Sequence, residues 1–273
     1  MSKIDWRSWL AALTLVGAAS AQQAGEEIPR QADARAQIRY AAGVRREGKG
    51  LKGDDRIDHL KRVAAAYEAV GRHFASSKAE CAEASFRLGE TRRSMGDREG
   101  AIGAFEEVVS NASSRRFSAR ALLEIGHLYR RSKEGTKALE AYARVIAEFP
   151  EEKGYRDDAY DWIGRVNAGA RNHEAARSAW MKVAEQGEDP VDRIRAFDRV
   201  AGSYIVEGKN VEAGAAIERC RSLFAELAEE STSRGARVKK ALGGMKSAAK
   251  LADALAKGQG EDGPDDDGDG PGQ

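Results

Sequence analysis

The chain has 273 residues, with 45 Lys and Arg against 44 Asp and Glu, and only five prolines. A net charge of +1 excludes the dense basic surface of a typical nucleic-acid-binding domain, and the many Ala, Glu and Arg residues favour helix. The charge is uneven. Because the first 21 residues carry +1 and the last 16 carry −6 of this total, the body between them carries +6. Composition therefore predicts an all-α protein with a mildly basic body.

Residues 1–21 have the features of a cleaved signal peptide. Lys3 and Arg7 precede an apolar run over residues 9–19, and Ala19-Ser20-Ala21 forms an A-x-A cleavage pattern before Gln22. The run is too short to span a bilayer. The alternative is an amphipathic N-terminal helix of a cytoplasmic protein. We expect an exported protein, periplasmic or secreted, whose mature chain has no stable membrane insertion.

Four consecutive segments repeat one pattern of small and large residues. The repeat is anchored by small residues 37, 38 and 37 positions apart, at Gly89, Gly126, Gly164 and Ala201. An alanine stands twelve residues after every anchor, and sixteen residues after the anchors stand Phe105, Tyr142, Trp180 and Ile217. Nineteen residues after them stand Val108, Val145, Val183 and Cys220. Small residues suit close helix crossings and large ones fill the space between helices, so each copy predicts one helix hairpin.

The order of residues from Ala119 to Pro150 resembles the tetratricopeptide repeat. A bulky residue, an anchoring Gly, an aromatic, an Ala, a second aromatic and a Pro follow one another as in that family. The spacing of 37 or 38 exceeds the family's usual period and is similar to long-period repeats of bacterial envelope proteins, such as outer-membrane assembly factors and the Tol–Pal cell-division coordinator. The resemblance implies a right-handed superhelical solenoid of antiparallel helix hairpins.

The repeat pattern, which we call the repeat frame, and the segments on either side of it divide the chain into five parts. After the leader, residues 22–77 hold a helix over 31–46, a glycine-broken insertion and a helix over 55–74, which together form a degenerate first repeat. Residues 78–229 hold four repeats, as hairpins at 78–111, 115–149, 154–186 and 190–229. Residues 230–257 supply one amphipathic helix that caps the last repeat, with membrane-surface binding as the alternative. Residues 258–273 form an acidic tail that we expect to be disordered, since it has no apolar residue to bury.

The sequence contains no recognisable catalytic or metal-binding motif. The four histidines are isolated in sequence, and an opening D-x-D-x-D-G calcium pattern in the tail ends before the glutamate that such a loop needs. Cys220 stands in a valine slot and Cys81 lies three repeats away, so we expect two buried thiols and no intramolecular disulfide. We expect a protein that is not an enzyme and has no cofactor and no metal.

In the family, the first helix of each hairpin lines a concave surface that binds peptides. Carried over residue by residue, the candidate partner-binding residues are Phe86, Glu90, Arg93, Arg120, Leu123, His127, Arg130, Arg131, Arg165 and Arg195. Several arginines on one surface suit an acidic or carboxylate-ended peptide, and the alternative is that they are ordinary solvated charges. Phe86 and Glu90 stand where chaperone-binding repeats carry Lys and Asn, so the resemblance does not extend to that clamp.

The sequence thus predicts an exported, non-catalytic scaffold that binds another protein or peptide and acts in a cell-envelope assembly. No nucleic-acid partner is expected, and the oligomeric state is open. Two alternatives remain at this point: a cell-wall or glycan-binding module, and an envelope enzyme whose site the sequence does not reveal. A regulatory hypothesis is that the acidic tail occupies the arginine-bearing surface.

Overall fold

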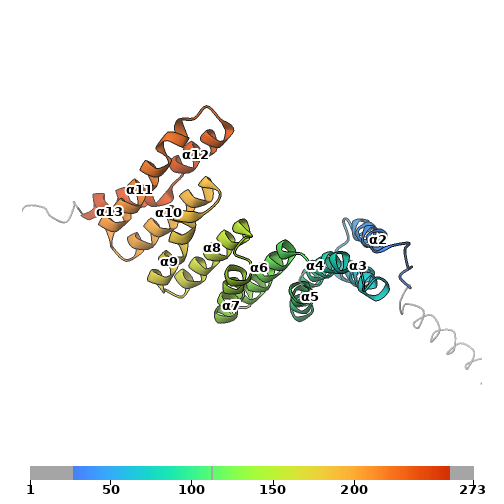
Figure 1. Ribbon diagram of the computed structural model, residues 1–273. Coiled ribbons are helices and arrows are strands. Elements are labelled where there is room, and N and C mark those ends of the chain that lie inside the picture. Colours follow the sequence, from blue (N-terminus) through green and yellow to red (C-terminus); the bar gives the residue numbers. More distant parts are fainter. Residues whose placement is uncertain (1–26, 112, 259–273) are drawn as a thin grey trace, which may run out of the picture. The chain divides into compact units, whose positions relative to one another are not determined.

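The computed structural model describes residues 27–111 and 113–258, and every regular element in this part of the chain is an α-helix. The predicted leader, and the predicted tail apart from Gly258, lie outside the described residues. The chain divides into two compact units, residues 1–101 and 102–273. Figure 1 shows helices joined by short turns throughout both units, so the all-α prediction is confirmed.

Among the described residues, the first unit contains three complete helices. They are α2 (Ala34–Glu47), α3 (Gly53–His73) and α4 (Lys78–Met95). Asp33 caps α2 by accepting a hydrogen bond from the Ala36 amide over 2.7 Å. The predicted insertion forms the connection to α3, where Gly50 and Gly53 adopt positive φ angles of 96° and 55°. Helix α5 (Arg98–Asn111) begins in this unit and continues into the second.

The second unit continues as helix hairpins at the positions that the repeat frame predicts. Its helices are α6 (Arg115–Arg131), α7 (Gly135–Glu148), α8 (Lys153–Gly169), α9 (His173–Gln186), α10 (Pro190–Val206) and α11 (Asn210–Glu229). Each helix from α6 to α10 packs on the helix that follows it in sequence. This arrangement confirms the prediction of consecutive packed hairpins.

The anchoring glycines lie where two helices of one hairpin cross closely. A Cβ atom placed on Gly126 of α6 would lie 2.7 Å from Cδ1 and 2.8 Å from Cζ of Tyr142 on α7. In the next hairpin, a Cβ on Gly164 would lie 2.5 Å from Cδ1 of Trp180. Real Cβ contacts are longer than this, so only glycine permits these crossings without a shift of the ring. The predicted role of both anchors is confirmed.

Each hairpin turn contains one residue in the left-handed conformation, seven positions after the anchor. The φ angles are 83° at Gly96, 63° at Lys133, 64° at Arg171 and 73° at Gly208. Lys133 and Arg171 are the only residues other than glycine with positive φ in the described part of the chain. The turn geometry therefore repeats with the same period as the anchors, even where the residue type does not favour it.

The C-terminal segment differs from the single capping helix expected over residues 233–257. It forms two helices, α12 (Ser233–Gly243) and α13 (Lys246–Gly258), separated at Gly244 and Met245. Two adjacent glycines weaken the helix at this point. The start of α13 is then held by α10, because both the amide and the hydroxyl of Ser247 donate to one carboxylate oxygen of Asp198, over 2.8 and 2.6 Å.

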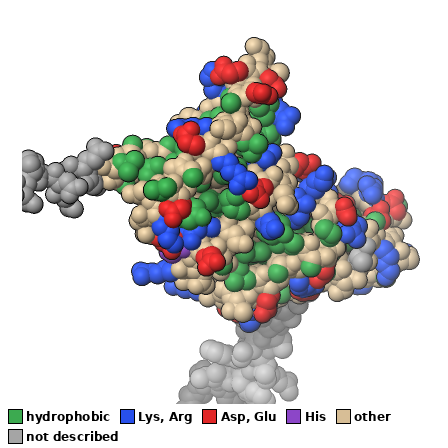
Figure 2. Space-filling model, turned by 60° about the vertical axis from the view of Figure 1, so that its left-hand side comes forward, with side chains coloured by type: hydrophobic (Ala, Val, Ile, Leu, Met, Phe, Trp, Pro, Cys, Tyr) green, Lys and Arg blue, Asp and Glu red, His purple; other side chains and the backbone are tan. Residues whose placement is uncertain are grey.

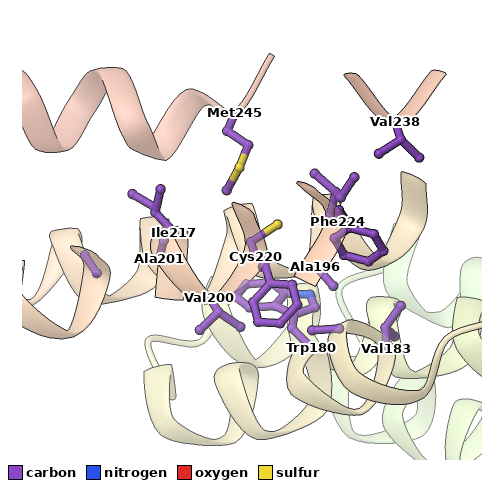
Figure 3. Packing of buried hydrophobic residues seen from close by; sticks show 14 of the residues in the cluster. Trp180, Val183, Ala196, Val200, Ala201, Ile217, Cys220, Phe224, Val238 and Met245 are labelled. Atoms are coloured by element: carbon purple, nitrogen blue, oxygen red, sulfur yellow. The ribbon is translucent and has the colours of Figure 1, made fainter. Parts of the chain in front are cut away.

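Both C-terminal helices complete the core of the last hairpin. Figure 3 shows Val238 of α12 and Met245, just before α13, above a layer that includes Trp180, Cys220 and Phe224. Cys220 is fully buried in the valine slot, and neither its sulfur nor that of Cys81 forms a disulfide within the described residues. The added helices cover apolar surface that the final repeat would otherwise expose.

Candidate functional site

Three of the ten predicted partner-binding residues are buried, which corrects their assignment to a binding surface. Phe86 and Leu123 are 0% and 5% exposed, because these large apolar side chains pack into the core rather than face outward. Glu90 is 8% exposed. Its carboxylate lies 2.8 Å from a guanidinium nitrogen of Arg87 and 3.9 Å from one of Arg45, so it serves an internal ion-pair cluster.

The other predicted residues have at least partial exposure but fall in two units. Arg93 is half-buried in the first unit. The second unit contains half-buried Arg120, His127 and Arg130, and exposed Arg131, Arg165 and Arg195. The structure brings His127, Arg130 and Arg165 together around one tryptophan, as described next. The candidate site is therefore built on the second unit.

Trp162 of α8 is the centre of an aromatic and cationic cluster. The guanidinium carbon of Arg130 lies 4.4 Å from the Trp162 ring centroid, and that of Arg165 lies 4.7 Å from it. His127 contacts the ring edge-on with centroids 4.9 Å apart. Such cation–π contacts hold the two arginine side chains in defined positions over a half-buried ring.

Helices α6 and α7 fix the orientation of His127 within this cluster. His127 Nδ1 and Tyr142 Oη are 2.7 Å apart, within hydrogen-bond distance. Burial above all raises the pKa of Tyr142 to about 12, so the phenol stays protonated. The sequence analysis placed Tyr142 in a core slot and did not assign Trp162 to the surface. The position of Trp162, two residues before an anchor on a first helix, is the signal that could have identified it.

A recess of about 620 Å³ lies beside Trp162, between α8 and α10. Its walls include Asp158, Asp161, Trp162 and Arg165 on α8, and Asp192, Arg195 and Arg199 on α10. The connection between α9 and α10 closes one end with Glu188 and Asp189. Asp189 also caps α10, since it accepts a hydrogen bond from the Val191 amide over 2.7 Å.

Ion pairs on the same surface involve three of the four arginines that line this recess. Asp161 lies 2.7 Å from Arg165 and 2.8 Å from Arg199, and the second pair links α8 to α10. Arg195 lies 2.8 Å from Asp192. Arg165 and Arg195, two of the arginines predicted to attract an acidic partner, are thus already paired with carboxylates of this chain.

Asp158 and Glu188 are the two acidic residues of the recess without an ion-pair partner among the described residues, and the surroundings of Asp158 shift its pKa. The carboxylate of Asp158 is accessible to solvent. The surrounding protein partly desolvates the carboxyl, and three neighbouring aspartates add repulsion: Asp192, Asp161 and Asp157. Together these effects raise the pKa of Asp158 to about 6 against a weaker opposing effect of Arg165.

A second recess of about 710 Å³ lies toward the C-terminal ends of the same two helices. It is lined by Ala168, Gly169, Arg171, His173, Trp180, Arg199, Gly202, Ser203, Val206 and Lys250. Val206 is 72% exposed, which is unusual for an aliphatic side chain of this size. Figure 2 shows hydrophobic side chains interspersed with basic and acidic ones on one face of the molecule.

The side chains of this surface are suited to non-covalent contacts. Among the described residues, no three His, Cys, Asp or Glu side chains are placed to hold a metal ion. Within the same ranges, no helix combines the length and the apolar character needed to cross a membrane. The surface contains an aromatic ring, guanidinium groups held over that ring, two carboxylates without an ion-pair partner among the described residues, and apolar side chains between two helices.

Comparison with known proteins agrees with the hairpin architecture. Residues 83–114 and 120–152 match the family model described as tetratricopeptide repeat. A crystal structure of MamA protein is similar with a TM-score of 0.51 and 21% identity, over 73% of this chain and 96% of that one. MamA 41-end from Desulfovibrio magneticus RS-1 gives a TM-score of 0.50 and 17% identity, over 74% and 100% of the two chains. No curated protein matches the sequence significantly. Residues 83–114 and 120–152 are therefore similar to tetratricopeptide repeats, and they lie within a fold of consecutive helix hairpins that the two solved structures share.

Proposed function

We propose that this protein is a non-catalytic scaffold that binds a partner polypeptide on the face formed by α6, α8 and α10. The observation that carries the proposal is Trp162, which is half-buried beside a recess of about 620 Å³ and held between side chains from two repeats. Tryptophan and arginine are the residue types that most often dominate protein–protein binding energy. The similarity of residues 83–114 and 120–152 to tetratricopeptide repeats supports the same class of function.

The Trp162 surroundings favour a polypeptide over a glycan. Sugar rings stack on an open aromatic face, whereas the guanidinium groups of Arg130 and Arg165 both lie within 4.7 Å of this ring centroid. A sugar would have to displace them. Guanidinium groups held over an indole instead present N–H donors to the carbonyl and carboxylate oxygens of a bound chain.

The experiment begins with photo-crosslinking in intact cells to identify the bound polypeptide. Its affinity for the purified protein is then measured by isothermal titration calorimetry with wild type, Trp162→Ala and the control Leu223→Ala. Leu223 is 49% exposed on α11, outside this face. We expect Trp162→Ala to weaken binding by about tenfold or more, as for a central contact residue, and Leu223→Ala to leave it unchanged.

Two outcomes would contradict the proposal. One is a crosslinked polypeptide whose affinity is the same for Trp162→Ala and wild type. The other is tight sedimentation with purified peptidoglycan that Trp162→Ala abolishes, since this would favour the glycan-binding alternative. Circular dichroism at 222 nm establishes that each variant is folded before its affinity is compared.

We also propose that the mature protein is exported and serves an assembly of the cell envelope. The support is the sequence of the leader, with two cations, an apolar run and the A-x-A pattern ending at Ala21. Expression in a bacterium followed by N-terminal sequencing should give a mature chain that begins at Gln22, recovered from the periplasm or the medium. A cytoplasmic protein that retains residues 1–21 would rule this out.

A further inference from the structure

The two recesses beside α8 and α10 belong to one groove. Arg199 lines both of them, and the other lining residues continue along the same two helices. On α8 they run from Asp158 to Gly169, and on α10 from Asp192 to Val206. We call this surface the α8–α10 groove. At a rise of 1.5 Å per residue, the α8 wall is about 17 Å long, enough for an extended segment of about five or six residues.

The floor of the groove is suited to a polypeptide backbone and small apolar side chains. The stretch beyond Arg199 is lined by Ala168, Gly202 and the exposed Val206. No side-chain atom lies within 4 Å of a Cβ placed on Gly202, so this part of the wall is open. The Asp161–Arg199 ion pair crosses between the helices at the point where the recesses meet.

The two ends of the groove carry opposite uncompensated charges. At the end near the helix N-termini, Asp157 is bonded to Arg156 over 2.9 Å and Asp192 to Arg195 over 2.8 Å. Asp158 and Glu188 have no ion-pair partner in the described ranges, and these two carboxylates outnumber the one lining cation without a partner there, Arg234. At the opposite end, neither Arg171 nor Lys250 has an ion-pair partner within those ranges. A bound segment therefore meets an anion at one end and cations at the other.

We infer that the α8–α10 groove binds an extended partner segment of about six residues with a Lys or Arg at the end that lies on Asp158 and an Asp or Glu at the end that lies on Arg171 and Lys250. The inference rests on the proposed function and specifies the chemistry of the partner. It replaces the uniformly acidic partner expected from the arginines alone, because Arg165, Arg195 and Arg199 are already ion-paired with Asp161 and Asp192 of this chain. Opposed end charges also fix the direction in which the segment lies.

The test uses fluorescein-labelled hexapeptides with blocked termini and the mature chain, residues 22–273. The four middle residues are alanine and leucine. The terminal residues are Lys and Asp, Gln and Asp, Lys and Asn, Lys and Lys, Asp and Asp, or Gln and Asn, with each unlike pair made in both orders. Fluorescence anisotropy in about 0.15 M salt gives the dissociation constants. We expect the better order of the Lys/Asp peptide to bind about tenfold more tightly than the Gln/Asn peptide and more tightly than either like-charged peptide.

Variants assign each end of the peptide to its partner in the groove. Asp158→Asn should abolish the preference for Lys over Gln and leave the preference for Asp over Asn intact. Arg171→Gln with Lys250→Gln should do the reverse. The matched controls are Asp55→Asn and Arg72→Gln, two exposed residues of α3 outside the groove, which should change neither preference.

Three results would each overturn the inference. They are tightest binding of the Asp/Asp peptide, dissociation constants that do not depend on the end charges, and no binding of any hexapeptide. The polypeptide identified by crosslinking separates this failure from that of the proposed function. If Trp162→Ala weakens that polypeptide's binding while Asp158→Asn and Arg171→Gln leave it unchanged, the scaffold function stands and the charge assignment is wrong. If Trp162→Ala has no effect, the proposed function itself fails.

Discussion

Replacing Gly126 by alanine tests the close crossing of α6 and α7. In an open helix position this change should stabilise the protein by up to about 1 kcal/mol, because alanine has the higher helix propensity. At Gly126 the new methyl group would lie within 2.8 Å of the Tyr142 ring, which is fully buried and has little room to move. Overpacking of a core costs about 1–3 kcal/mol. The expected net result is a loss of about 1–2 kcal/mol in the free energy of unfolding.

Gly103 provides the matched control for this substitution. It lies in α5, is exposed, and has no heavy atom within 4 Å of the position that a Cβ would take. Gly103→Ala should therefore raise the free energy of unfolding by up to about 1 kcal/mol. Urea denaturation followed by circular dichroism, with linear extrapolation, measures both variants against wild type.

A double-mutant cycle locates the origin of the loss. Tyr142→Leu removes the ring that the Gly126→Ala methyl group meets, so the two changes should couple by about 1–2 kcal/mol in the direction of rescue. The reasoning is refuted if Gly126→Ala is as stable as Gly103→Ala, or if the two substitutions in the cycle are additive. Either result would mean that the ring shifts at no cost.

Three further predictions follow from the turns and from the titrating groups. Lys133→Gly should raise the free energy of unfolding by about 0.5 kcal/mol, because relief of the left-handed conformation exceeds the larger chain entropy of glycine; a lower melting temperature would contradict this. Burial above all raises the pKa of Cys220 to about 12, so iodoacetamide at pH 8 should label this thiol, as read by peptide mass spectrometry, only after unfolding in urea. The folded-state pKa of Asp158, about 6, lies above its unfolded value, so this group lowers stability progressively as the pH rises from about 4 to 6. Asp158→Asn should gain stability relative to wild type over that range, by no more than about 1 kcal/mol because the carboxyl is accessible to solvent. A difference in the free energy of unfolding between the two proteins that stays constant across the range would be inconsistent with the shift.

Much of the fold could be predicted because the repeat frame records local packing. The anchors at Gly126 and Gly164 and the large residues sixteen positions later are partners within one hairpin, so their spacing follows directly from helix geometry. The same frame also contains the left-handed turn residue seven positions after each anchor. That signal was present in the sequence but is weak, since Lys133 and Arg171 do not have the residue type that such a turn favours.

Contacts between distant residues decided what the frame could not. The C-terminal segment forms two helices because Asp198 on α10 bonds to Ser247, 49 residues later, at the start of α13. Phe86 and Leu123 were assigned to the surface by position in the repeat, whereas burial against other helices decides which side of a first helix is exposed. Periodicity identifies a helix face but not what covers it.

The sequence by itself determined the helix hairpins, their boundaries and the close crossings, because each of these depends on residues near one another in the chain. Only the tertiary structure decided the character of the candidate site. Trp162 becomes its centre through Arg130 of the preceding hairpin, and the charge of Arg199 is offset by Asp161 of α8. The sequence does not show whether a carboxylate from another helix neutralises a given arginine. The net charge that a partner meets therefore depends on how the helices pack.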